Sequence, residues 1–476
     1  MEKTIDNSWA KSKTWQVALF PAYRGVLVTF VALMTFVSYA AVGGYGIATV
    51  AAGTIASACK IFDGVVDPFL AFFGDRFVTK YGRVRILLSS GFFFMALGTL
   101  ILFFWGIGTN VVVYVLANLL YILGRSIFQV GGDTGNVIST KDPKQRAAMG
   151  RWGVIFSTCS TAVLSVYNSM LLLPKYGKLD MPALQELTIV VLSANAAMTL
   201  CSVLAIAEKD RPENLKLGVG KVDLKACWSL LKGNVPLRCF VVSMASDQLA
   251  NQIASQSAIS IMVFGIVMGN YSLRGKLSMF ELVPTILFVF FASRFAGKRG
   301  MKKGLVFWTK ICMLISVVMV AYMALIDTAQ ISSNTLLWII FIVIDILFAA
   351  SRSAVSACTN AIRPDITDYE LYRSGTFMPS VMAATVTLTN EIVSSLGTTI
   401  VGIGLAAIGY VNTMPQPGDQ LTGPIFWMAM LLWMGMPFFG WLCTVIAMRF
   451  YKLDKDAMAE IQRVNAERRE ASKNIS

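Results

Sequence analysis

Histidine is absent from this chain of 476 residues, and charged residues make up only 14% of it. Without histidine, the protein cannot contain a histidine proton relay or a histidine-bound metal. Its eight cysteines lie in hydrophobic stretches, apart from Cys227, and show neither metal-ligand spacing nor a redox motif. The sequence also lacks a phosphate-binding Gly-Lys-Ser/Thr loop and a serine nucleophile elbow. We therefore expect no enzyme activity, no cofactor and no nucleotide hydrolysis.

Hydrophobic residues make up 56% of the chain, which is far from the composition of a soluble domain. A helix crosses the hydrocarbon core of a membrane with ~20 mainly apolar residues, because each residue advances it by about 1.5 Å. The chain supplies about twelve such stretches, so we expect an all-α integral membrane protein with twelve transmembrane helices. The expected spans are Trp15–Ala41, Ile47–Phe73, Ile86–Ile107, Val111–Val130, Trp152–Leu173, Leu187–Ala207, Cys239–Met268, Ser278–Phe291, Leu305–Ile326, Leu336–Ala361, Phe377–Ile408 and Ile425–Met448.

The expected spans form two sets of six, separated by a polar stretch. We expect an N-terminal six-helix bundle over residues 1–207, a cytoplasmic linker over 208–238, a C-terminal six-helix bundle over 239–449 and a cytoplasmic tail over 450–476. Alternate loops are rich in Lys and Arg, and short cationic loops stay on the cytoplasmic side during insertion. Both termini are therefore expected in the cytoplasm, with the chain in the cell inner (plasma) membrane.

The formal net charge of +14 is concentrated in the loops that flank the expected spans. In a soluble protein this charge would suggest nucleic acid, but here it indicates topology and contact with anionic lipid. We expect membrane lipid and a small-molecule substrate as partners, with no nucleic acid and no obligate protein partner.

Two carboxylates, Asp63 and Asp67, lie inside the second expected span. A charge near the bilayer centre costs about 2.5 to 3.5 kcal/mol even on the lenient insertion scale. Residues four apart share one face of a helix, and two adjacent carboxylates repel unless a cation or a proton neutralises them. The pair is thus a candidate site for Na⁺ or H⁺. The alternative is an ion pair between Asp63 and Lys60, one turn earlier, that only allows the helix to pack.

Three motifs resemble those of a known family. The segment Lys60-Ile-Phe-Asp63-Gly-Val-Val-Asp67-Pro68 resembles the second-helix signature of the glycoside-pentoside-hexuronide:cation symporters, the melibiose permease family. Gly74-Asp75-Arg76 with Tyr81-Gly82-Arg83-Val84-Arg85 is similar to the loop between helices two and three of the wider major facilitator superfamily. Asp365-Ile-Thr-Asp368-Tyr369-Glu370 is similar to a cytoplasmic loop of the same symporters. The resemblance covers nearly the whole chain.

The resemblance implies a major facilitator fold, in which two six-helix bundles rock around a central cavity. It places the coupling cation on Asp63 and Asp67, with Asp133 of the fourth span and Gln129, one turn earlier, as further ligands. The charged cytoplasmic segments are implied to lock one conformational state. The residues of this cytoplasmic gate are Asp75, Arg76, Arg83, Arg85, Asp365 and Asp368.

Other positions depart from the family pattern, and these departures concern the substrate. The acidic residue of the family's first helix is missing, with Arg24 nearby. The fourth-helix aspartate position falls at Gly132, next to Asp133, and the fourth-helix tryptophan position falls near Gly135. A helix-eleven lysine of the best-known member is replaced by Glu391. The resemblance therefore supports the coupling mechanism more strongly than it supports a particular sugar.

Arg352 lies near the middle of the tenth expected span, where an arginine needs a partner. Asp345, two turns away on the same face, and Glu391 on the next span are candidates for a structural ion pair. Alternatively, Arg352 with Arg125 or Arg24 binds an anionic group of the substrate. The seventh span adds a stripe of amide and hydroxyl side chains at helical spacing, which suits a hydroxyl-bearing substrate or interhelical hydrogen bonds. Its binding candidates are Asn251 and Gln256.

These observations favour a cation-coupled secondary active symporter that imports a sugar, glycoside or sugar acid with Na⁺ or H⁺ by alternating access. One alternative is a carrier of a lipid-like or amphipathic solute. The other is a sensor that binds its substrate without transporting it.

Overall fold

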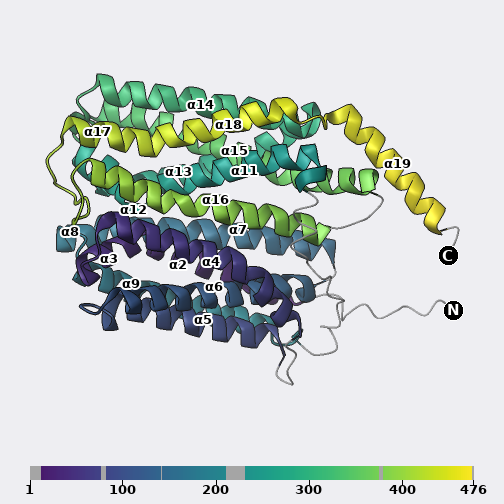
Figure 1. The fold of residues 1–476 in the computed structure, drawn as a ribbon, viewed down its shortest axis with the longest axis horizontal. Helices are drawn as coiled ribbons and strands as arrows, with labels where there is room; N and C mark the ends of the chain where they lie inside the picture. The colour runs from purple at the N-terminus through teal and green to yellow at the C-terminus, as the bar shows by residue number, and fades with distance from the viewer. Residues whose placement is uncertain (1–11, 77–81, 141, 211–230, 375–378, 474–476) are drawn as a thin grey trace. The chain divides into compact units, whose positions relative to one another are not determined.

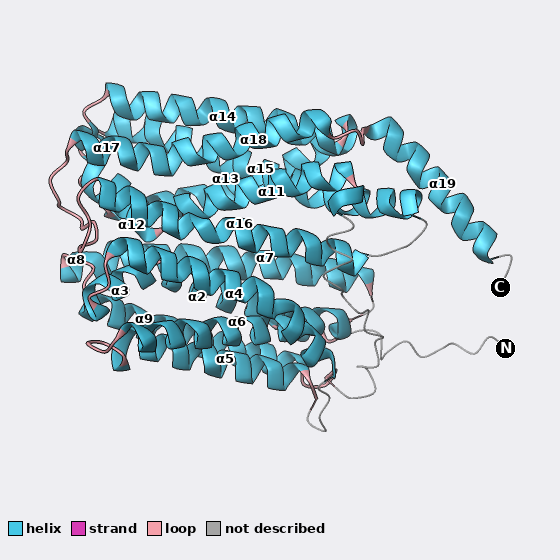
Figure 2. Ribbon diagram, in the orientation of Figure 1, coloured by secondary structure: helices cyan, strands magenta, loops and turns pink. Residues whose placement is uncertain are grey.

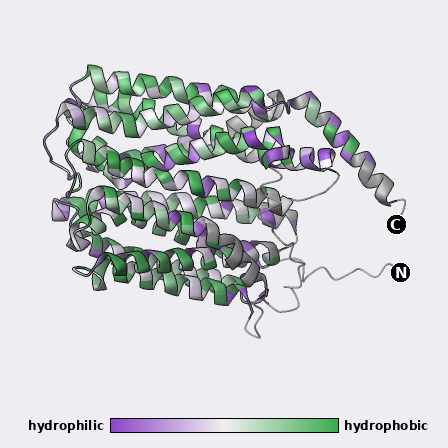
Figure 3. Ribbon diagram, viewed as in Figure 1, coloured by the Kyte–Doolittle hydropathy of each residue, from purple (hydrophilic) through white to green (hydrophobic). Residues whose placement is uncertain are grey.

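The computed structural model describes residues 12–76, 82–140, 142–210, 231–374 and 379–473 (Figure 1). Within these ranges the regular elements are helices, most of them joined by short loops (Figure 2). The helices are strongly hydrophobic, whereas hydrophilic residues recur along the last one, α19 (Lys455–Lys473) (Figure 3). The all-α prediction is confirmed.

The chain divides into two compact units. Unit 1 comprises residues 1–221 with 405–416, and unit 2 comprises residues 222–404 with 417–476. Hydrogen bonds attach the segment 405–416 to unit 1: the Tyr39 hydroxyl donates to the carbonyl oxygen of Pro415 at 2.7 Å, and the amide of Thr49 donates to that of Val411 at 2.9 Å. The sequence predicted a division in the linker 208–238, and it gave no sign that this later segment belongs to the first unit.

Unit 1 begins with a broken first span, since Pro21 separates two helices. Its helices are α1 (Thr14–Leu19), α2 (Ala22–Met34), α3 (Val37–Tyr45), α4 (Thr49–Arg76), α5 (Val84–Leu100), α6 (Val111–Ser139), α7 (Pro143–Val166), α8 (Leu173–Tyr176) and α9 (Met181–Ile206). The π-helical turns η2 (Ile101–Trp105) and η3 (Tyr167–Leu172) extend α5 and α7. Helix α2 packs on α7 and α9, and α6 packs on α4 and α5.

Unit 2 is built around α15, on which α13, α14 and α19 pack, while α11 packs on α18. Its helices are α11 (Val235–Ala254), α12 (Ser257–Ser260), α13 (Ser272–Arg299), α14 (Met301–Leu325), α15 (Thr335–Ser374), α16 (Pro379–Ala407), α17 (Gly423–Met430), α18 (Met436–Phe450) and α19. The π-helical segments η5 (Ile261–Val267) and η7 (Leu431–Gly435) continue α12 and α17, and η6 (Thr328–Ser332) is a 3₁₀ turn before α15.

Nine helical segments in the described ranges are long and apolar enough to cross a membrane, and a bent pair makes ten. The bent pair is α11 with the segment 257–267, which meet at 57°. Helix α11 ends there because Gln256 adopts an extended backbone, with ψ of 139°. Helices α4 and α13, of 28 residues each, are also long enough to cross, since a crossing needs ~20 residues. Ten segments and these two match the twelve expected spans.

Helices α5 and α6 pack backbone against backbone through glycine. A Cβ atom at Gly124 would lie 2.5 Å from the amide nitrogen of Met95 and 2.8 Å from the carbonyl oxygen of Gly91. At Gly98 it would lie 2.7 Å from the amide nitrogen of Tyr121. Small residues at such crossings allow membrane helices to approach closely, and van der Waals packing then holds them together.

Replacing Gly124 with alanine should therefore destabilise unit 1. The added methyl group meets backbone atoms that cannot rotate away, and overpacking of this kind costs about 1–3 kcal/mol. Gly150 of α7 is the matched control, because no atom lies within 4 Å of its Cβ position. In a helix interior, alanine is favoured over glycine by about 0.5–1 kcal/mol. Thermal unfolding in detergent should show a lower midpoint for Gly124→Ala and an equal or higher one for Gly150→Ala; equal losses in both variants would contradict the packing account.

Candidate functional site

The buried carboxylate of Asp63 on α4, 3% exposed, is held by two residues of α6. Arg125 Nη2 forms an ion pair with Asp63 Oδ2, and Ser126 Oγ donates a hydrogen bond to Oδ1 at 2.9 Å. Both oxygens of Asp63 thus have partners, and these come from α6 rather than from Lys60. The backbone of Asp67 continues α4, whereas its side chain lies outside the described residues.

Asp133, also on α6, belongs to a second network that reaches α2. The Tyr23 hydroxyl donates to Asp133 Oδ1 at 3.5 Å and accepts a hydrogen bond from Asn136 Nδ2. Arg24 Nε donates to the same hydroxyl at 3.4 Å, and its guanidinium lies 5.9 Å from the centroid of the Tyr23 ring. The structure therefore places Asp63 and Asp133 in two different networks of unit 1.

Two glycines of α6 make room for aromatic rings of the first span. A Cβ atom at Gly132 would lie 2.2 Å from Cε2 of Tyr23, and one at Gly135 would lie 2.2 Å from Cζ of Phe20. Each of these aromatic residues is only 1% exposed, so its ring has no room to move aside. This packing explains why these positions hold neither the aspartate nor the tryptophan of the family that the sequence resembles. Gln129, further up the same helix, is exposed.

Unit 2 contains a cavity of about 460 Å³ among α11, α13, α15 and α18. Two arginines and two carboxylates line it, together with hydroxyl and amide groups. Its polar residues are Asp247, Gln248, Asn251, Glu281, Arg352, Ser353, Ser356, Thr359 and Arg363. Its apolar wall includes Met244, Pro437 and Trp441. A cavity of this kind can bind a small polar solute through several hydrogen bonds and one charged contact.

Arg352 is held in this cavity by a neutral side chain. Its Nη2 donates a hydrogen bond to Asn251 Oδ1, and its guanidinium lies 5.6 Å from the centroid of the Phe348 ring. Among the described residues, neither Asp345 nor Glu391 forms an ion pair with it within 4.0 Å. Asp247 is its acidic neighbour, also without an ion pair at that distance. The structural ion pair considered for Arg352 is thus replaced by a hydrogen bond to an amide.

The remaining substrate candidates are distributed over other places. Gln256 is buried at the bend after α11, where its Nε2 donates to the carbonyl oxygen of Gln252 at 3.2 Å. Glu391 is half-buried on α16 and does not line the cavity. Of the six candidates, Asn251 and Arg352 are the two that the cavity brings together.

Sequence reasoning missed several residues of the cavity, namely Glu281, Ser353, Ser356, Thr359, Arg363 and Trp441. A signal was present for Glu281, because a carboxylate within an expected span indicates function in the same way as Asp63 does. No comparable signal existed for Trp441, since aromatic residues are common in membrane helices.

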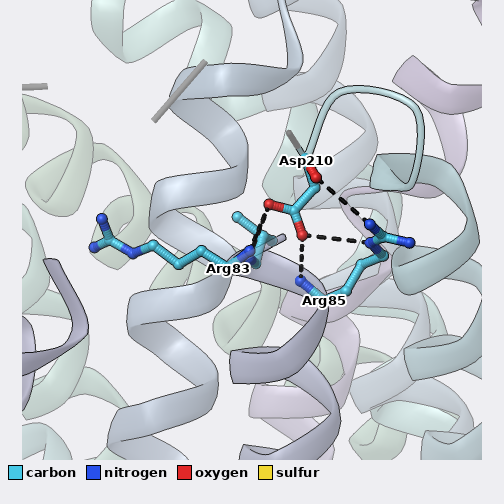
Figure 4. A network of polar contacts seen from close by, with 4 residues as sticks. Arg83, Arg85 and Asp210 are labelled. Atoms are coloured by element: carbon cyan, nitrogen blue, oxygen red, sulfur yellow. Dashed lines mark hydrogen bonds and ion pairs between the residues drawn. The ribbon is translucent and has the colours of Figure 1, made fainter. Parts of the chain in front are cut away.

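At one end of unit 1, Asp210 closes the N-terminus of α5 (Figure 4). Its Oδ1 accepts from the amides of Arg83 at 2.9 Å and Val84 at 3.1 Å, and its Oδ2 accepts from the amide of Arg85 at 2.9 Å. The Arg85 guanidinium adds an ion pair of 3.4 Å to Oδ2. A carboxylate is favoured here because the first amides of a helix lack internal partners and carry the positive end of its dipole.

Gly82 permits this contact between Asp210 and α5. Its φ of +94° suits glycine, and a Cβ atom there would lie 2.3 Å from Asp210 Oδ2. The gate candidates Asp75 and Arg76 end α4, and their side chains lie outside the described residues. The sequence assigned Asp210 to the linker, so its role was not predicted.

The acidic gate residues of unit 2 lie on a helix rather than in the expected loop. Helix α15 continues to Ser374 and thus includes Asp365 and Asp368. Glu370, 1% exposed, accepts hydrogen bonds from Asn234 Nδ2 at 2.7 Å and from Arg373 Nη2 at 2.8 Å. The polarity of this segment predicts that it leaves the hydrocarbon, but polar residues also form helices when tertiary contacts hold them.

The chain also matches a family model. The model of the MFS/sugar transport protein family covers residues 22–455. The chain belongs to this family. Its members are membrane transporters, so the twelve-helix major facilitator fold of two six-helix bundles is confirmed for this MFS transporter.

Solved structures of other transporters share the fold at low sequence identity. The nucleoside transporter NupG is 13% identical, with a TM-score of 0.57 over 91% of this chain and 99% of that one. A bacterial homologue of the human lysosomal transporter Spinster is 12% identical, with a TM-score of 0.60 over 94% and 99%. The transporter FucP is 12% identical, with a TM-score of 0.52 over 92% and 98%. No curated protein matches the chain. Identities this low support the fold alone.

Asp210→Ala should destabilise this transporter by leaving the amide of Arg83 and the first two amides of α5 without their acceptor. Loss of a helix cap costs about 0.5–2 kcal/mol. Hydrogen exchange followed by mass spectrometry should show faster exchange at Val84 and Arg85. Glu208→Ala is the matched control, because this exposed carboxylate binds the side chains of Lys13 and Gln16 at α1 rather than the amides of α5. If the α5 amides exchanged at the same rate in both variants, the role of Asp210 as the cap of α5 would be contradicted.

The carboxyl group of Asp365 makes the stability of the folded protein depend on pH. Burial, and secondly the neighbouring Asp368, raises the pKa of Asp365 from 3.8 to about 6. Because the folded state holds the proton more tightly than the unfolded state, stability falls as the pH rises from about 4 to about 6. Asp365→Asn should therefore unfold at a higher temperature than the wild type at pH 7.5 and at the same temperature near pH 4. If the unfolding temperatures of the two proteins differed by the same amount at both pH values, the raised pKa of Asp365 would be contradicted.

Proposed function

We propose that this MFS transporter is a symporter that imports a sugar, glycoside or sugar acid together with Na⁺ or H⁺. It acts in the cell inner membrane by alternating access, with both termini in the cytoplasm. The fold supports transport of a small molecule, and the family description supports a sugar.

The observation that carries the proposal is Arg352, a charged side chain between membrane helices whose hydrogen-bond partner is the amide of Asn251. An arginine in such a place needs an anion or several strong acceptors. The amide leaves most of its five N–H donors available, and the cavity provides room beside them. A carboxylate of the substrate would complete the site by bidentate hydrogen bonds.

Hydroxyl-bearing groups complete the case for a sugar. Ser353, Ser356 and Thr359 line one wall on α15, and Gln248 and Asn251 line another on α11. These groups both donate and accept hydrogen bonds, as sugar hydroxyl groups do. A lipid-like solute would need an apolar wall in their place.

For the coupling cation we propose Asp63 and Asp67, on the resemblance of their motif to the symporters named above. The ion pair with Arg125 gives this site a switch, because a cation at Asp63 competes with Arg125 for Oδ2. Release of Arg125 would then alter the contact between α4 and α6. Cation binding and conformational change are thereby linked.

Arg352→Gln should weaken the binding of an acidic sugar far more than that of a neutral one. Hydrogen bonds to charged groups contribute about 1.5–3 kcal/mol, which corresponds to about 10-fold to 100-fold in affinity. The measurement compares a hexuronide with its matched hexose glycoside by calorimetry or thermal shift on purified protein. The affinity for the neutral hexose glycoside should fall by less than about threefold, since loss of the charged contact leaves its hydroxyl contacts intact.

Ser353→Ala provides the control, because it removes a hydroxyl group from the same wall without changing charge. It should weaken both sugars similarly. Equal binding of both sugars to the wild type, unchanged in Arg352→Gln, would exclude an anion site at Arg352.

A further inference from the structure

Asp345 is a buried carboxyl group that the proposed coupling site does not use. It is 5% exposed and lies ten residues into α15, about 15 Å along the helix. Its Oδ2 is enclosed and, in the described part of the chain, has no hydrogen-bond partner. An isolated carboxylate between membrane helices is costly, so this side chain requires a neutralising partner.

A charged neighbour of Asp345 is another acid, Glu281 of α13. Arg274, two turns before Glu281, lies 3.7 Å from Glu281 Oε1 and neutralises one of the two carboxylates. Arg352 is a more distant cationic neighbour on α15 itself. From the helices packed on α15, Glu281 and Arg274 of α13 face Asp345. Cys312 of α14 and Asp247 of α11 face Arg352.

Two carboxyl groups in contact cannot both remain ionised at low cost, and sharing one proton removes the repulsion. Since Arg274 pairs with Glu281, the proton belongs on Asp345. A proton on Asp345 turns this carboxyl group into a hydrogen-bond donor, and the carboxylate of Glu281 can accept from it. Protonation thus removes the buried charge and the repulsion between the two acids in one step.

We propose that Asp345 and Glu281 form a proton-binding site in unit 2, separate from the Asp63 site, which loads and releases one proton through the cavity. Glu281 lines the cavity, whereas Asp345 lies behind it. A proton from cavity water therefore passes to Glu281 and then to Asp345, and it leaves by the reverse path. No further reactant is required, since the step is a proton transfer between carboxyl groups and water.

The site is linked to substrate binding through Arg352, and this part rests on the proposed function. Asp345 and Arg352 are seven residues apart on α15, which places them on the same face two turns apart. A substrate anion bound to Arg352 cancels the positive charge that would stabilise ionised Asp345. Substrate binding therefore favours the protonated carboxyl, and by reciprocity the proton favours the substrate.

The first test needs no substrate. Infrared difference spectroscopy of the purified protein follows the carbonyl band of a protonated carboxyl group as the pH is raised. Among the bands that disappear as the pH is raised, the wild type should show one that Asp345→Asn and Glu281→Gln each abolish or displace. Asp63→Asn is the matched control, since it removes a buried carboxylate of unit 1, and it should retain the band. The proposal is overturned if no band is lost or displaced in both unit 2 variants, or if the band that they affect is also lost in Asp63→Asn.

The second test separates this inference from the proposed function. In proteoliposomes, Asp345→Asn should lose accumulation driven by a proton gradient while substrate exchange between the two sides continues. Accumulation by Asp345→Asn equal to the wild type overturns the link to transport. If the wild type neither exchanges nor accumulates any sugar, the proposed function fails, and the infrared result alone decides whether the proton site exists.

Discussion

The main constraint on this transporter is the cost of placing charge between membrane helices. Each carboxylate or guanidinium there requires a partner from a neighbouring helix, because the hydrocarbon supplies none. In unit 1 the constraint is met by the ion pair between Asp63 and Arg125, which joins α4 to α6. In unit 2 it is met differently, because Arg352 has an amide partner and Asp345 faces another acid. We propose that a substrate or a proton gains binding energy at these incompletely neutralised charges.

Buried carboxylates at the ends of the helices also require partners. Asp210 supplies an acceptor to three amides at the N-terminus of α5, counting that of Arg83 just before it, and Glu370 binds Asn234 and Arg373. Both carboxylates are almost fully buried, at 1% exposure, although they lie outside the apolar spans. They connect segments that are distant in sequence within each unit. A transporter that changes conformation needs such rigid attachments so that each unit moves as one body.

The sequence was sufficient for the number of spans, because ~20 apolar residues in a row have few other uses. It also identified Asp63 and Arg352 as residues that need explanation. It could not identify their partners, because Arg125 and Asn251 lie 62 and 101 residues away and only the packing of helices brings them near. Glu281 was overlooked although its position inside a span was visible. The segment from Asp365 to Glu370 was expected to be a loop, since polarity shows where a helix leaves the membrane and not where it ends.

The measurement that tests the central claim most directly is uptake of a radiolabelled hexuronide into proteoliposomes containing the purified transporter. An inward gradient of Na⁺ or H⁺ is imposed and then abolished with an ionophore. The account predicts accumulation above the external concentration that depends on one of the two gradients and collapses with it. Equilibration without accumulation under either gradient would contradict cation-coupled symport.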